Sequence, residues 1–419
     1  MTAPDSTDSP VRIRQAEGPP AAVIRHRRAQ PFFGRHPWVF VGAIEELLTE
    51  DGQLPLPGAV IRVLSHERKF IAWGLFNPHS RIIIRLYSWQ ESDDVTQPEF
   101  WDKLVLSAVL LRKRLFNLSA DGCGCRLIFS ESDGLSGLTV DLYAGCLLVQ
   151  FTSLALYHHR EHLLNSLQLH VRPQGIWLRT ERGMREQEQL EAVDGLLRGN
   201  APPQPLFIEY SGISFGVDVQ QGQKTGYYLD QRDNRFAASR YLQGAHILDA
   251  FCFSGGFGIT AVRQGNAASA VGVDSSQPAL TLAAANAELN GISEKCQWIC
   301  SDVQDALAEF RAQERLFDGV ILDPPRMART RGGIDRAVQG YRRLNLAALE
   351  VLRPGGIFVT CSCSGLVSRQ QFVEMIGDVA RQSGRDIRIL EHLGQPADHP
   401  VSATCPETDY LKVLICEVS

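Results

Sequence analysis

The sequence contains neither a long apolar run nor a strong excess of charge of one sign. No stretch of about 18 consecutive apolar residues occurs in the chain, so we expect no membrane segment. The 42 basic and 47 acidic residues among 419 leave a net charge of −5, so any binding of nucleic acid must use local basic patches. Residues 1–20 lack the apolar core of a secretory signal and predict a flexible tail.

Cysteine is also sparse for a chain of this length. The 10 cysteines are spread from Cys123 to Cys416, which argues against a disulfide scaffold. A structural zinc site needs about four clustered ligands. Cys125 and Cys123 have no second pair nearby, so we expect no metal site. Because an export signal is missing as well, the sequence predicts reduced thiols and a cytoplasmic protein.

The domain organisation is predicted from three regions that differ in their pattern of apolar and turn residues. Residues 21–90 carry short strand-like segments between turns, which predicts a small β-barrel. Residues 91–205 combine helical patterns with further strands, which predicts a central α+β domain ending in a proline-rich linker. The strands expected in these two regions are 58–64, 70–75, 81–87, 138–143 and 146–151, and the helices are 100–116 and 154–167.

Residues 206–419 alternate apolar strands with helical segments. This alternation predicts an α/β domain with a parallel, doubly wound sheet, whose ligands bind beyond the carboxyl ends of the strands. The expected strands are 246–250, 270–274, 297–302, 319–323 and 356–361, with a helix at 277–290.

An acidic residue stands at or near the end of four of these strands. They are Asp249, Asp274, Asp302 and Asp323. A single aspartate in such a place is well explained as the N-cap of the following helix. Four in successive units favour a ligand-binding edge, because a carboxylate is costly to bury.

Glycines follow the first of these aspartates. The stretch Ser254-Gly255-Gly256 lets the backbone turn sharply and approach a ligand. Gly256 to Ala261 formally matches the fingerprint G-x-G-x-x-A, and Asp274 follows this segment about twenty residues later. An NAD-dependent dehydrogenase is therefore one hypothesis.

A carboxylate directly before the glycines favours a different adenosine cofactor, S-adenosyl-L-methionine (SAM). Asp249 would repel a pyrophosphate but suits the cationic amino-acid part of SAM. Asp274 could accept the ribose hydroxyls, and Asp302 the adenine amino group. The residues expected to bind this cofactor are Asp249, Phe251, Ser254, Gly255, Gly256, Asp274, Ser275, Asp302, Asp323, Tyr228 and Arg232.

The fourth and fifth strands carry the residues expected to do chemistry. Two prolines after Asp323 hold it rigidly, and Arg326 follows where enzymes that methylate exocyclic amino groups have an aromatic residue. Cys361 and Cys363 share one face of the fifth strand, with Cys363 nearer the carboxyl-end pocket. Small core cysteines are the ordinary explanation. Their place opposite Asp323 favours Cys363 as a nucleophile.

A cysteine beside an aspartate predicts carbon methylation of a pyrimidine. Thiolate addition to carbon 6 activates carbon 5, which takes the methyl group before a base removes its proton and the thiol leaves. Asp323 could protonate or hydrogen-bond the ring nitrogen N3 as electrons move there. Asp323 and Cys363 together indicate this reaction better than either residue does alone.

Several segments along the chain together match a family pattern. They are 34–40, 131–141, 222–235, 249–258, 323–325, 362–365 and 395–400. On these segments the chain resembles the bacterial large-subunit (23S) ribosomal RNA 5-methylcytosine methyltransferase family, over nearly its whole length apart from the tail. The resemblance implies an N-terminal PUA domain at 21–90, a central domain at 91–205 and a class I, Rossmann-like methyltransferase domain at 206–419. It also implies that Cys363 is the nucleophile.

Two residues depart from the family pattern. Arg326 stands where the family usually has lysine, which keeps the charge but changes its geometry. Cys361 is an additional thiol near the expected nucleophile. A related guanine methyltransferase domain shares Lys-Thr-Gly and Asp-Pro-Pro but lacks the cysteine, so Cys363 argues against that reaction.

Local basic patches fit an RNA substrate. Six arginines and one acidic residue lie between residues 12 and 36, and Phe32, Phe33 and Trp38 lie among or just after them. Charge mixed with aromatic rings suits phosphate contact and base stacking. A solvated strand explains the run equally well, and the resemblance favours RNA. The residues expected to bind RNA are Arg25, Arg27, Arg28, Arg35, Lys224 and Arg326.

The segment 224–235 contains Tyr228 and Arg232, for which two interpretations are open. They could form a wall over the cofactor and hold its carboxylate, or they could begin a helix that ties the sheet to its neighbour. Near the end of the chain, His399 could be a base or a structural residue.

The leading hypothesis is a SAM-dependent RNA methyltransferase that forms 5-methylcytosine, with large-subunit ribosomal RNA as its partner. A dehydrogenase and a noncatalytic RNA-binding protein are the alternatives. The sequence does not fix the target nucleotide or the oligomeric state, and a homodimer is one of the states considered.

Overall fold

The structure is a computed structural model that describes residues 11–180, 182–219, 226–328 and 330–419. The chain folds into two compact units. Unit 1 runs to Pro203 and includes Val401–Pro406, and unit 2 comprises Gln204–Pro400 and Glu407–Ser419. Short 3-10 helices cover Val41–Ala43, Ser130–Asp133, Leu229–Gln231, Ser293–Lys295, Arg331–Gly333 and Pro406–Thr408.

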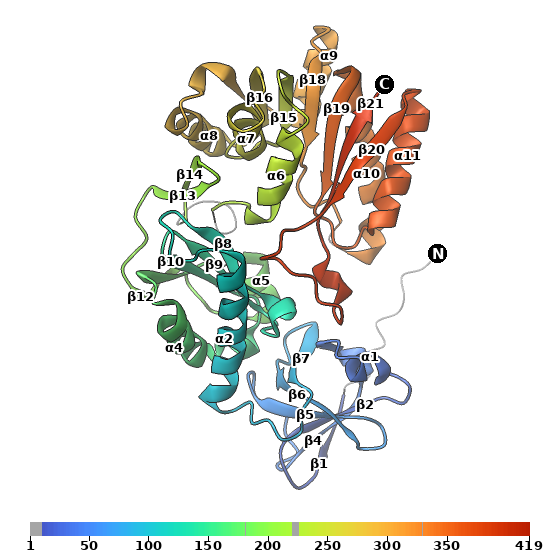
Figure 1. The fold of residues 1–419 in the computed structure, drawn as a ribbon. Coiled ribbons are helices and arrows are strands. Elements are labelled where there is room, and N and C mark those ends of the chain that lie inside the picture. The colour runs from blue at the N-terminus through green and yellow to red at the C-terminus, as the bar shows by residue number, and fades with distance from the viewer. Residues whose placement is uncertain (1–10, 181, 220–225, 329) are drawn as a thin grey trace. The chain divides into compact units, whose positions relative to one another are not determined.

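The N-terminal part of unit 1 is a curled seven-stranded sheet with the short helix α1 (Gln30–Phe33). Its strand order is β1-β4-β2-β5-β6-β7-β3 (Figure 1). The strands are β1 (Arg12–Gln15), β2 (Ala21–Ile24), β3 (Trp38–Phe40), β4 (Ile44–Thr49), β5 (Val60–Leu64), β6 (Phe70–Phe76) and β7 (Ile82–Ser88). The strands expected near 58–64, 70–75 and 81–87 are therefore confirmed. The flexible tail expected over residues 1–20 is wrong for β1, which pairs in parallel with β4.

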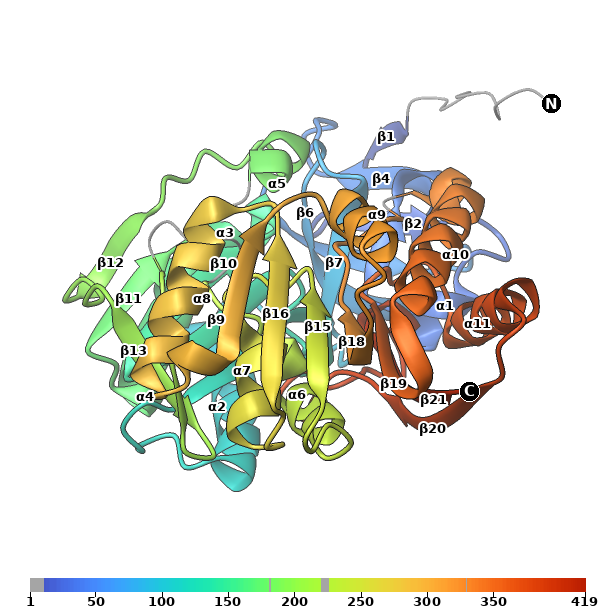
Figure 2. The same cartoon turned by 90° about the horizontal axis from the view of Figure 1, so that it is seen from above.

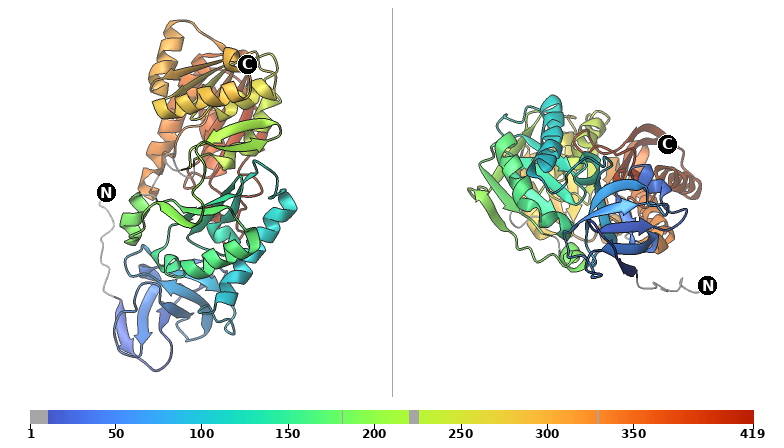
Figure 3. Two further views of the ribbon diagram at one scale, coloured as in Figure 1. Left: turned by 90° about the vertical axis from the view of Figure 1, so that its left-hand side faces the viewer. Right: turned by 90° about the horizontal axis from the view of Figure 1, so that it is seen from below.

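The second part of unit 1 is a five-stranded sheet covered by helices. Its order is β12-β11-β10-β9-β8, and α2 and α4 pack side by side (Figure 3). The strands are β8 (Gly124–Phe129), β9 (Leu138–Tyr143), β10 (Cys146–Phe151), β11 (Gly175–Leu178) and β12 (Gly195–Gly199). The helices are α2 (Pro98–Leu115), α3 (Leu154–Tyr157), α4 (Arg160–Val171) and α5 (Arg182–Glu188).

Helix α2 illustrates why the sequence pattern was informative. Proline occupies the first turn, where its missing N–H costs nothing, and basic residues in the last turn complement the helix dipole. Val105, Ala108 and Val109 recur at helical spacing and are buried against the sheet. The helix expected at 154–167 is divided instead, because α3 ends at Tyr157 and α4 begins at Arg160.

Polar side chains join the two sheets of unit 1. Arg85 of β7 is buried and donates to Glu131 and Ser136, and it pairs with Glu188 at 3.7 Å. The Tyr87 hydroxyl donates to the Ser136 carbonyl at 2.6 Å. A buried arginine shared by two carboxylates fixes the register between the sheets, because losing either partner would leave a buried charge.

Unit 2 begins with the hairpin of β13 (Leu206–Tyr210) and β14 (Ile213–Val217). Its main sheet has seven described strands in the order β17-β16-β15-β18-β19-β21-β20, in which β21 runs antiparallel to both β19 and β20 and the other described pairs are parallel. The strands are β15 (His246–Ala250), β16 (Ser269–Asp274), β17 (Cys296–Cys300), β18 (Phe317–Leu322), β19 (Leu352–Ser362), β20 (Ile387–Leu393) and β21 (Lys412–Val418). This is the doubly wound α/β sheet that the sequence predicted.

Helices cover both faces of this sheet (Figure 2). On one face α6, α7 and α8 pack together, and on the other α10 packs against α9 and α11. The helices are α6 (Arg232–Ser239), α7 (Gly256–Arg263), α8 (Gln277–Leu289), α9 (Val303–Ala312), α10 (Ile334–Glu350) and α11 (Arg369–Ser383). Among the described residues, no helix combines the length and apolar character that crossing a bilayer requires.

Candidate active site

The strand order of unit 2 reverses between β15 and β18, and such a switch point opens a crevice at the carboxyl ends of the strands. In the register, Ala250 pairs with Leu322, and Leu322 pairs with Thr360. The residues that follow these positions therefore meet at one edge. Asp323 leaves β18 there, and its N–H donates to the Ala250 carbonyl at 3.3 Å.

Asp249 lies just before the end of β15 and is almost fully buried. Its Oδ2 accepts the N–H of Gly258 at 2.8 Å, in the first turn of α7. Among the described residues its Oδ1 has no hydrogen-bond partner. The pKa of Asp249 is raised to about 7, chiefly by burial; the hydrogen bond from Gly258 and the charge of Arg235 oppose this increase, and the charges of Asp323 and Asp274 add to it.

The bond to Gly258 bears directly on the choice of cofactor. A dinucleotide places its pyrophosphate on the N–H groups at the start of the helix after the first strand. Here a carboxylate of the chain already occupies that position. The formal G-x-G-x-x-A match therefore does not form an anion site, and the geometry opposes the dehydrogenase hypothesis.

The loop between β15 and α7 has an unusual backbone. Phe251, Phe253 and Gly255 have φ values of 64°, 48° and 79°. A Cβ atom at Gly255 would lie 2.6 Å from the Trp298 ring, so the loop requires glycine there for space as well as for conformation. Ser254 is buried, and its carbonyl accepts from the Asn286 side chain at 3.2 Å. The loop is thus held closely against β16, β17 and α8.

Asp274 ends β16 with a carboxylate held by the backbone. Its Oδ2 accepts from Phe253 N at 3.0 Å, and its Oδ1 accepts from Ser276 N at 2.9 Å. Ser275 is exposed beside it. Asp302 differs from the expectation, because β17 ends at Cys300 and Asp302 is the N-cap of α9, where it accepts from Gln304 N at 2.8 Å.

Arg232 does not lie as the cofactor interpretation expected. It is buried and its guanidinium forms ion pairs of 3.3 Å with Asp398 and with Asp233. Asp398 also lies 3.1 Å from His399 Nδ1, and both residues are buried. These contacts favour the structural interpretation for Arg232 and His399. Lys224 lies outside the described residues.

Arg235 is a residue that the sequence analysis missed. It is 6% exposed, and among the described residues its Nε and Nη1 have no hydrogen-bond partner. Its guanidinium lies 4.5 Å from the Tyr227 ring centroid, and a Cβ atom at Gly256 would be 2.6 Å from its Nε. A buried cation therefore sits directly beside the glycine loop. Its position about one helical turn after Arg232 was the available signal, but spacing does not reveal which arginine is already paired.

The aromatic residues of this region line the same loop. Tyr228 is half-buried and meets the Phe253 ring edge-on, with ring centroids 5.1 Å apart. Phe251 is also half-buried. Phe251 therefore lies on the loop and Tyr228 lies beside it.

The two cysteines of the fifth strand have different environments. Cys361 lies within β19 opposite Val413 of β21 and is fully buried, and burial raises its pKa well above the usual range. Cys363 lies just beyond β19, is half-buried, and has its Sγ 3.7 Å from the Pro324 carbonyl oxygen. Cys363 therefore faces the Asp-Pro-Pro loop, whereas Cys361 packs in the core.

Ser364 joins the cysteine turn to the Asp-Pro-Pro loop. Its buried hydroxyl accepts from the N–H groups of Met327 and Ala328, both at 3.1 Å, and lies 2.9 Å from the Tyr341 hydroxyl. Arg326 is exposed, with its Nε donating to the Ala328 carbonyl at 3.0 Å. The two loops thus form one hydrogen-bonded structure beside Cys363.

Four of the arginines expected to bind RNA belong to unit 1. Arg25, Arg27, Arg28 and Arg35 are all exposed, and Arg25 Nε donates to the Ile44 carbonyl at 2.9 Å. The expected stacking residues are only partly available. Phe33 is 49% exposed, whereas Phe32 is buried and Trp38 donates its indole N–H to Glu131 at 2.9 Å. The stacking role expected for Phe32 is therefore wrong.

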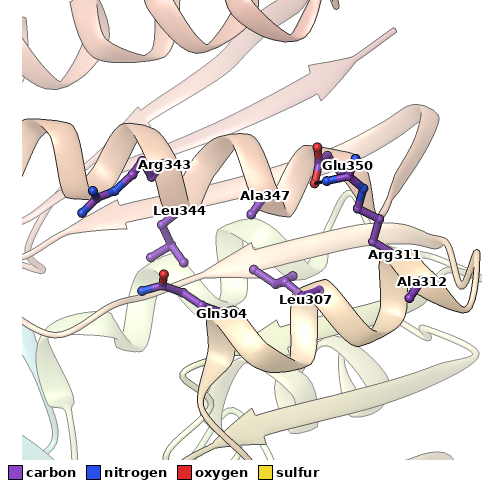
Figure 4. A pocket seen from close by; sticks show the side chains of 9 residues that line it. Gln304, Leu307, Arg311, Ala312, Arg343, Leu344, Ala347 and Glu350 are labelled. Atoms are coloured by element: carbon purple, nitrogen blue, oxygen red, sulfur yellow. Dashed lines mark hydrogen bonds and ion pairs between the residues drawn. The ribbon is translucent and has the colours of Figure 1, made fainter.

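A separate groove of about 470 Å³ lies between α9 and α10 (Figure 4). Leu307 and Leu344 form its apolar floor, and an ion pair of 3.0 Å between Arg311 and Glu350 crosses one end. No buried polar atom without a partner occurs among its described lining residues. It is a gap between two surface helices and not the crevice at the strand ends.

Comparison with known proteins agrees with this geometry. Residues 23–89 match the model of a PUA-like domain, and residues 135–415 match that of S-adenosylmethionine-dependent methyltransferases. Ribosomal RNA large subunit methyltransferase I of Pseudoalteromonas atlantica is 38% identical over 393 residues, which is 93% of this chain and 97% of the relative. The protein of the same name from Vibrio cholerae is 38% identical over 404 residues, 95% of this chain and 99% of the relative.

The chain belongs to the ribosomal RNA large subunit methyltransferase I family. It is a SAM-dependent methyltransferase with an N-terminal PUA-like domain, which confirms the fold and the cofactor expected from the sequence and rejects the dehydrogenase. A Streptococcus mutans protein assigned to the SAM-dependent methyltransferases has the same fold, with a TM-score of 0.80 at 20% identity over 95% of this chain and 99% of that one. A methyltransferase solved with SAH has a TM-score of 0.81 at 20% identity and the same coverage.

The raised pKa of Asp249 predicts a pH-dependent stability. The unfolded carboxyl ionises with its ordinary pKa of 3.8, whereas the folded one holds its proton to about pH 7, so the free energy of unfolding falls as pH rises between these values. Asp249→Asn removes this dependence. The free energy of unfolding can be measured by urea titration without ligand. We expect the difference between variant and wild type to shift in favour of the variant by on the order of 2–3 kcal/mol from pH 5 to pH 7.

The matched control is Asp378→Asn, which alters an exposed i,i+3 ion pair on α11 and should change stability by less than about 1 kcal/mol at both pH values. An Asp249→Asn variant that gains nothing on the wild type between pH 5 and pH 7 would contradict the assignment.

Proposed function

We propose that this enzyme methylates carbon 5 of a cytosine in large-subunit ribosomal RNA. The names of its relatives support ribosomal RNA as the substrate. The observation that carries the carbon-5 reaction is the half-buried Cys363. Its sulfur lies 3.7 Å from the carbonyl oxygen of Pro324 in the Asp-Pro-Pro loop, at the sheet edge where β15 ends just after Asp249. Amino-group methylation would need no thiol there.

The buried polar groups of the edge fit the amino-acid end of SAM. In that end, an ammonium group and a carboxylate group are attached to the same carbon atom. Within the described chain, Asp249 Oδ1 is an unpartnered acceptor, and two unpartnered nitrogens of Arg235 are donors beside the same glycine loop. Burying either group without a partner is costly, and a zwitterion would satisfy both. We therefore assign the ammonium to Asp249 and the carboxylate to Arg235.

The remaining cofactor contacts follow the strand ends outward. Asp274, held rigidly by two backbone N–H groups, would accept the ribose hydroxyls, with Ser275 beside it. The capping role of Asp302 uses its Oδ1, and Oδ2 would accept from the adenine amino group. Tyr228 and Phe251 would cover the cofactor, and Ser254, Gly255 and Gly256 would let its amino-acid end approach the backbone. Asp323 closes the site on the substrate side.

The mechanism assigns one role to each residue at the substrate. Cys363 loses its thiol proton to water, and its sulfur forms a bond to carbon 6 of cytosine. The π electron pair of the carbon 5–carbon 6 double bond moves through carbon 4 to N3, where the carboxyl group of Asp323, in its protonated form, donates a proton that returns to it when the sulfur leaves. When bound, SAM supplies an electrophilic methyl group. After carbon 5 is methylated, a base removes its proton and the bond between sulfur and carbon 6 breaks, which restores the thiolate.

Substitution of the two cysteines tests the nucleophile. Cys363→Ala should lower methyl transfer to ribosomal RNA by more than about 10³-fold, because the bond to carbon 6 can no longer form. The same variant should form no covalent complex with RNA containing 5-fluorocytosine, which traps the adduct. Cys361→Ala, the matched control, should stay active and trap normally. An active Cys363→Ala beside an inactive Cys361→Ala would overturn the assignment.

Arg235→Met tests the carboxylate contact by calorimetry. Losing charge-assisted hydrogen bonds should raise the Kd for SAH about 10–100-fold. The Kd for 5′-methylthioadenosine, which lacks the amino-acid end, should not change. Arg240→Met is the control. Arg240 directly follows α6, the helix that carries Arg235, but it is exposed and pairs with Glu391. Equal weakening of both ligands would show that Arg235 acts only on the fold.

The exposed arginines of unit 1 would contact RNA phosphates. The triple variant of Arg27, Arg28 and Arg35 to Gln should weaken RNA binding and lower the slope of log K against log salt by about 2, with the Kd for SAH unchanged. A control triple variant of Arg353, Arg381 and Arg388 to Gln removes equal charge from exposed ion pairs of unit 2. If both triple variants lowered the slope of log K against log salt equally, RNA binding would not be specific to the arginines of unit 1. Arg326, at the exposed end of the Asp-Pro-Pro loop, would contact the RNA nearest the target base.

A ribosomal RNA substrate would place the enzyme in the cytoplasm, in agreement with 10 free cysteines in the described chain. Every residue assigned to the reaction comes from unit 2 of one chain, so the reaction itself needs no dimer. The homodimer considered from the sequence stays a prediction that sedimentation can test.

A further inference from the structure

Lys412 is a buried cation whose described partners are neutral. It begins β21 and is 1% exposed. Its Nζ donates to the carbonyl oxygens of Ser364 at 2.7 Å and Tyr410 at 3.0 Å. Among its described hydrogen-bond partners there is no carboxylate, and the exposed Asp409 acts on it only as a charge. Buried lysines are rarely found unless they are paired, so two neutral carbonyls do not explain why a charge is kept here.

The contacts of Lys412 bracket Cys363. In the register of the sheet, Lys412 pairs with Ser362, the residue before Cys363. Its ammonium bonds to the carbonyl of Ser364, the residue after Cys363. The strand and the turn therefore hold the ammonium beside the backbone that carries the thiol.

Other charged groups around the cysteine turn do not replace Lys412. Arg326 and Arg369 carry like charge to Lys412 and act on it from the Asp-Pro-Pro loop and from α11, whereas Asp409 is an exposed acid just before β21. Tyr341 of α10 and the half-buried Asp323 also face the thiols of this edge. Among these groups, Lys412 combines burial with a direct bond to the turn.

We propose that Lys412 is a positioning residue that holds Cys363 in its thiolate form by placing a buried ammonium behind the Ser-Cys-Ser-Gly turn. The inference rests on the proposed function, in which Cys363 is the nucleophile. The step is a proton transfer alone, in which the S–H bond breaks, the proton goes to water and nothing is oxidised or reduced. The resulting negative sulfur and the ammonium stabilise each other.

The electrostatic link between the two residues is reciprocal. Burial lowers the pKa of Lys412 to about 8, and the charges of Asp409 and Cys363 oppose that decrease. Whatever the thiolate adds to the pKa of the ammonium, the ammonium subtracts from the pKa of the thiol. The charge pair is therefore effective below about pH 8, where Lys412 stays protonated.

The pH dependence of Cys363 alkylation tests this inference without RNA or cofactor. Iodoacetamide labelling, quantified at each cysteine by mass spectrometry, gives the apparent pKa of Cys363, with the exposed Cys300 as internal reference. In Lys412→Met we expect labelling of Cys363 at pH 7 to slow about 10-fold and its pH midpoint to rise by about one. Lys412→Arg should restore most of the effect, and labelling of Cys300 should not change.

Arg385→Met is the matched control for a merely structural role. Arg385 also donates to backbone carbonyls, those of Leu349, Leu352, Arg353 and Val418, at the opposite end of the same two strands. It should lower the melting temperature and leave the Cys363 midpoint unchanged. If Lys412→Met behaves in the same way, Lys412 only ties the turn and the inference fails.

The two proposals fail separately. An active Cys363→Ala with a Lys412-dependent thiol midpoint would reject the nucleophile and keep the charge pair. An inactive Cys363→Ala with an unchanged midpoint in Lys412→Met would keep the nucleophile and reject the charge pair. If Lys412→Met unfolds, the midpoints of Lys412→Arg and Lys412→Gln decide the question, because both retain hydrogen-bond donors and only the first keeps the charge.

Discussion

The hydrogen bond from Gly258 to Asp249 is the constraint that shapes the cofactor end of unit 2. The start of a helix after the first strand of a doubly wound sheet is normally a site for an anion. Here a buried carboxylate accepts from that helix start, and two further acids of the same edge raise its pKa. On this basis we proposed that Asp249 holds the ammonium of SAM and that Arg235 beside it holds the carboxylate of the same SAM molecule. One internal hydrogen bond therefore separates a methyl-donor site from a dinucleotide site in chains with nearly the same glycine pattern.

The substrate end relies on a different connection, the one that Ser364 makes. Its hydroxyl accepts from the N–H groups of Met327 and Ala328, so the cysteine turn and the Asp-Pro-Pro loop are held together as one structure. Lys412 and Tyr341 reach the same residue from β21 and α10. This arrangement gives the two cysteines separate environments although they lie only two residues apart. Cys361 packs in the sheet, and Cys363 stands beyond it against Pro324.

Unit 1 combines a rigid junction with a charged surface. Buried Arg85 and its two glutamates hold the seven-stranded and five-stranded sheets in register. Trp38 is part of this junction because its indole N–H donates to Glu131. Phe32 is buried in the core of the seven-stranded sheet. In the proposed contact with RNA, the exposed arginines would therefore act with little aromatic support. Such a surface suits contact with the phosphates and shape of folded RNA more than stacking on separate bases.

Local patterns in the chain were enough to predict the architecture and the strand ends at which the candidate site lies. Hydrophobic periodicity is a property of short segments, so the strands at 138–143, 146–151 and 246–250 and the helix near 100–116 could be predicted. The edge where Asp249, Asp323 and Cys363 meet followed from the order of those strands, because parallel strands end on the same side of a sheet.

The folded chain alone reveals which charges are already paired. Arg232 forms an ion pair with Asp398, which lies 166 residues away in the sequence. Arg235 on the same short helix has two nitrogens without a hydrogen-bond partner among the described residues. Lys412 reaches Ser364 from the last strand. Pairing depends on contacts between residues far apart in the chain, and no spacing within one segment carries that information.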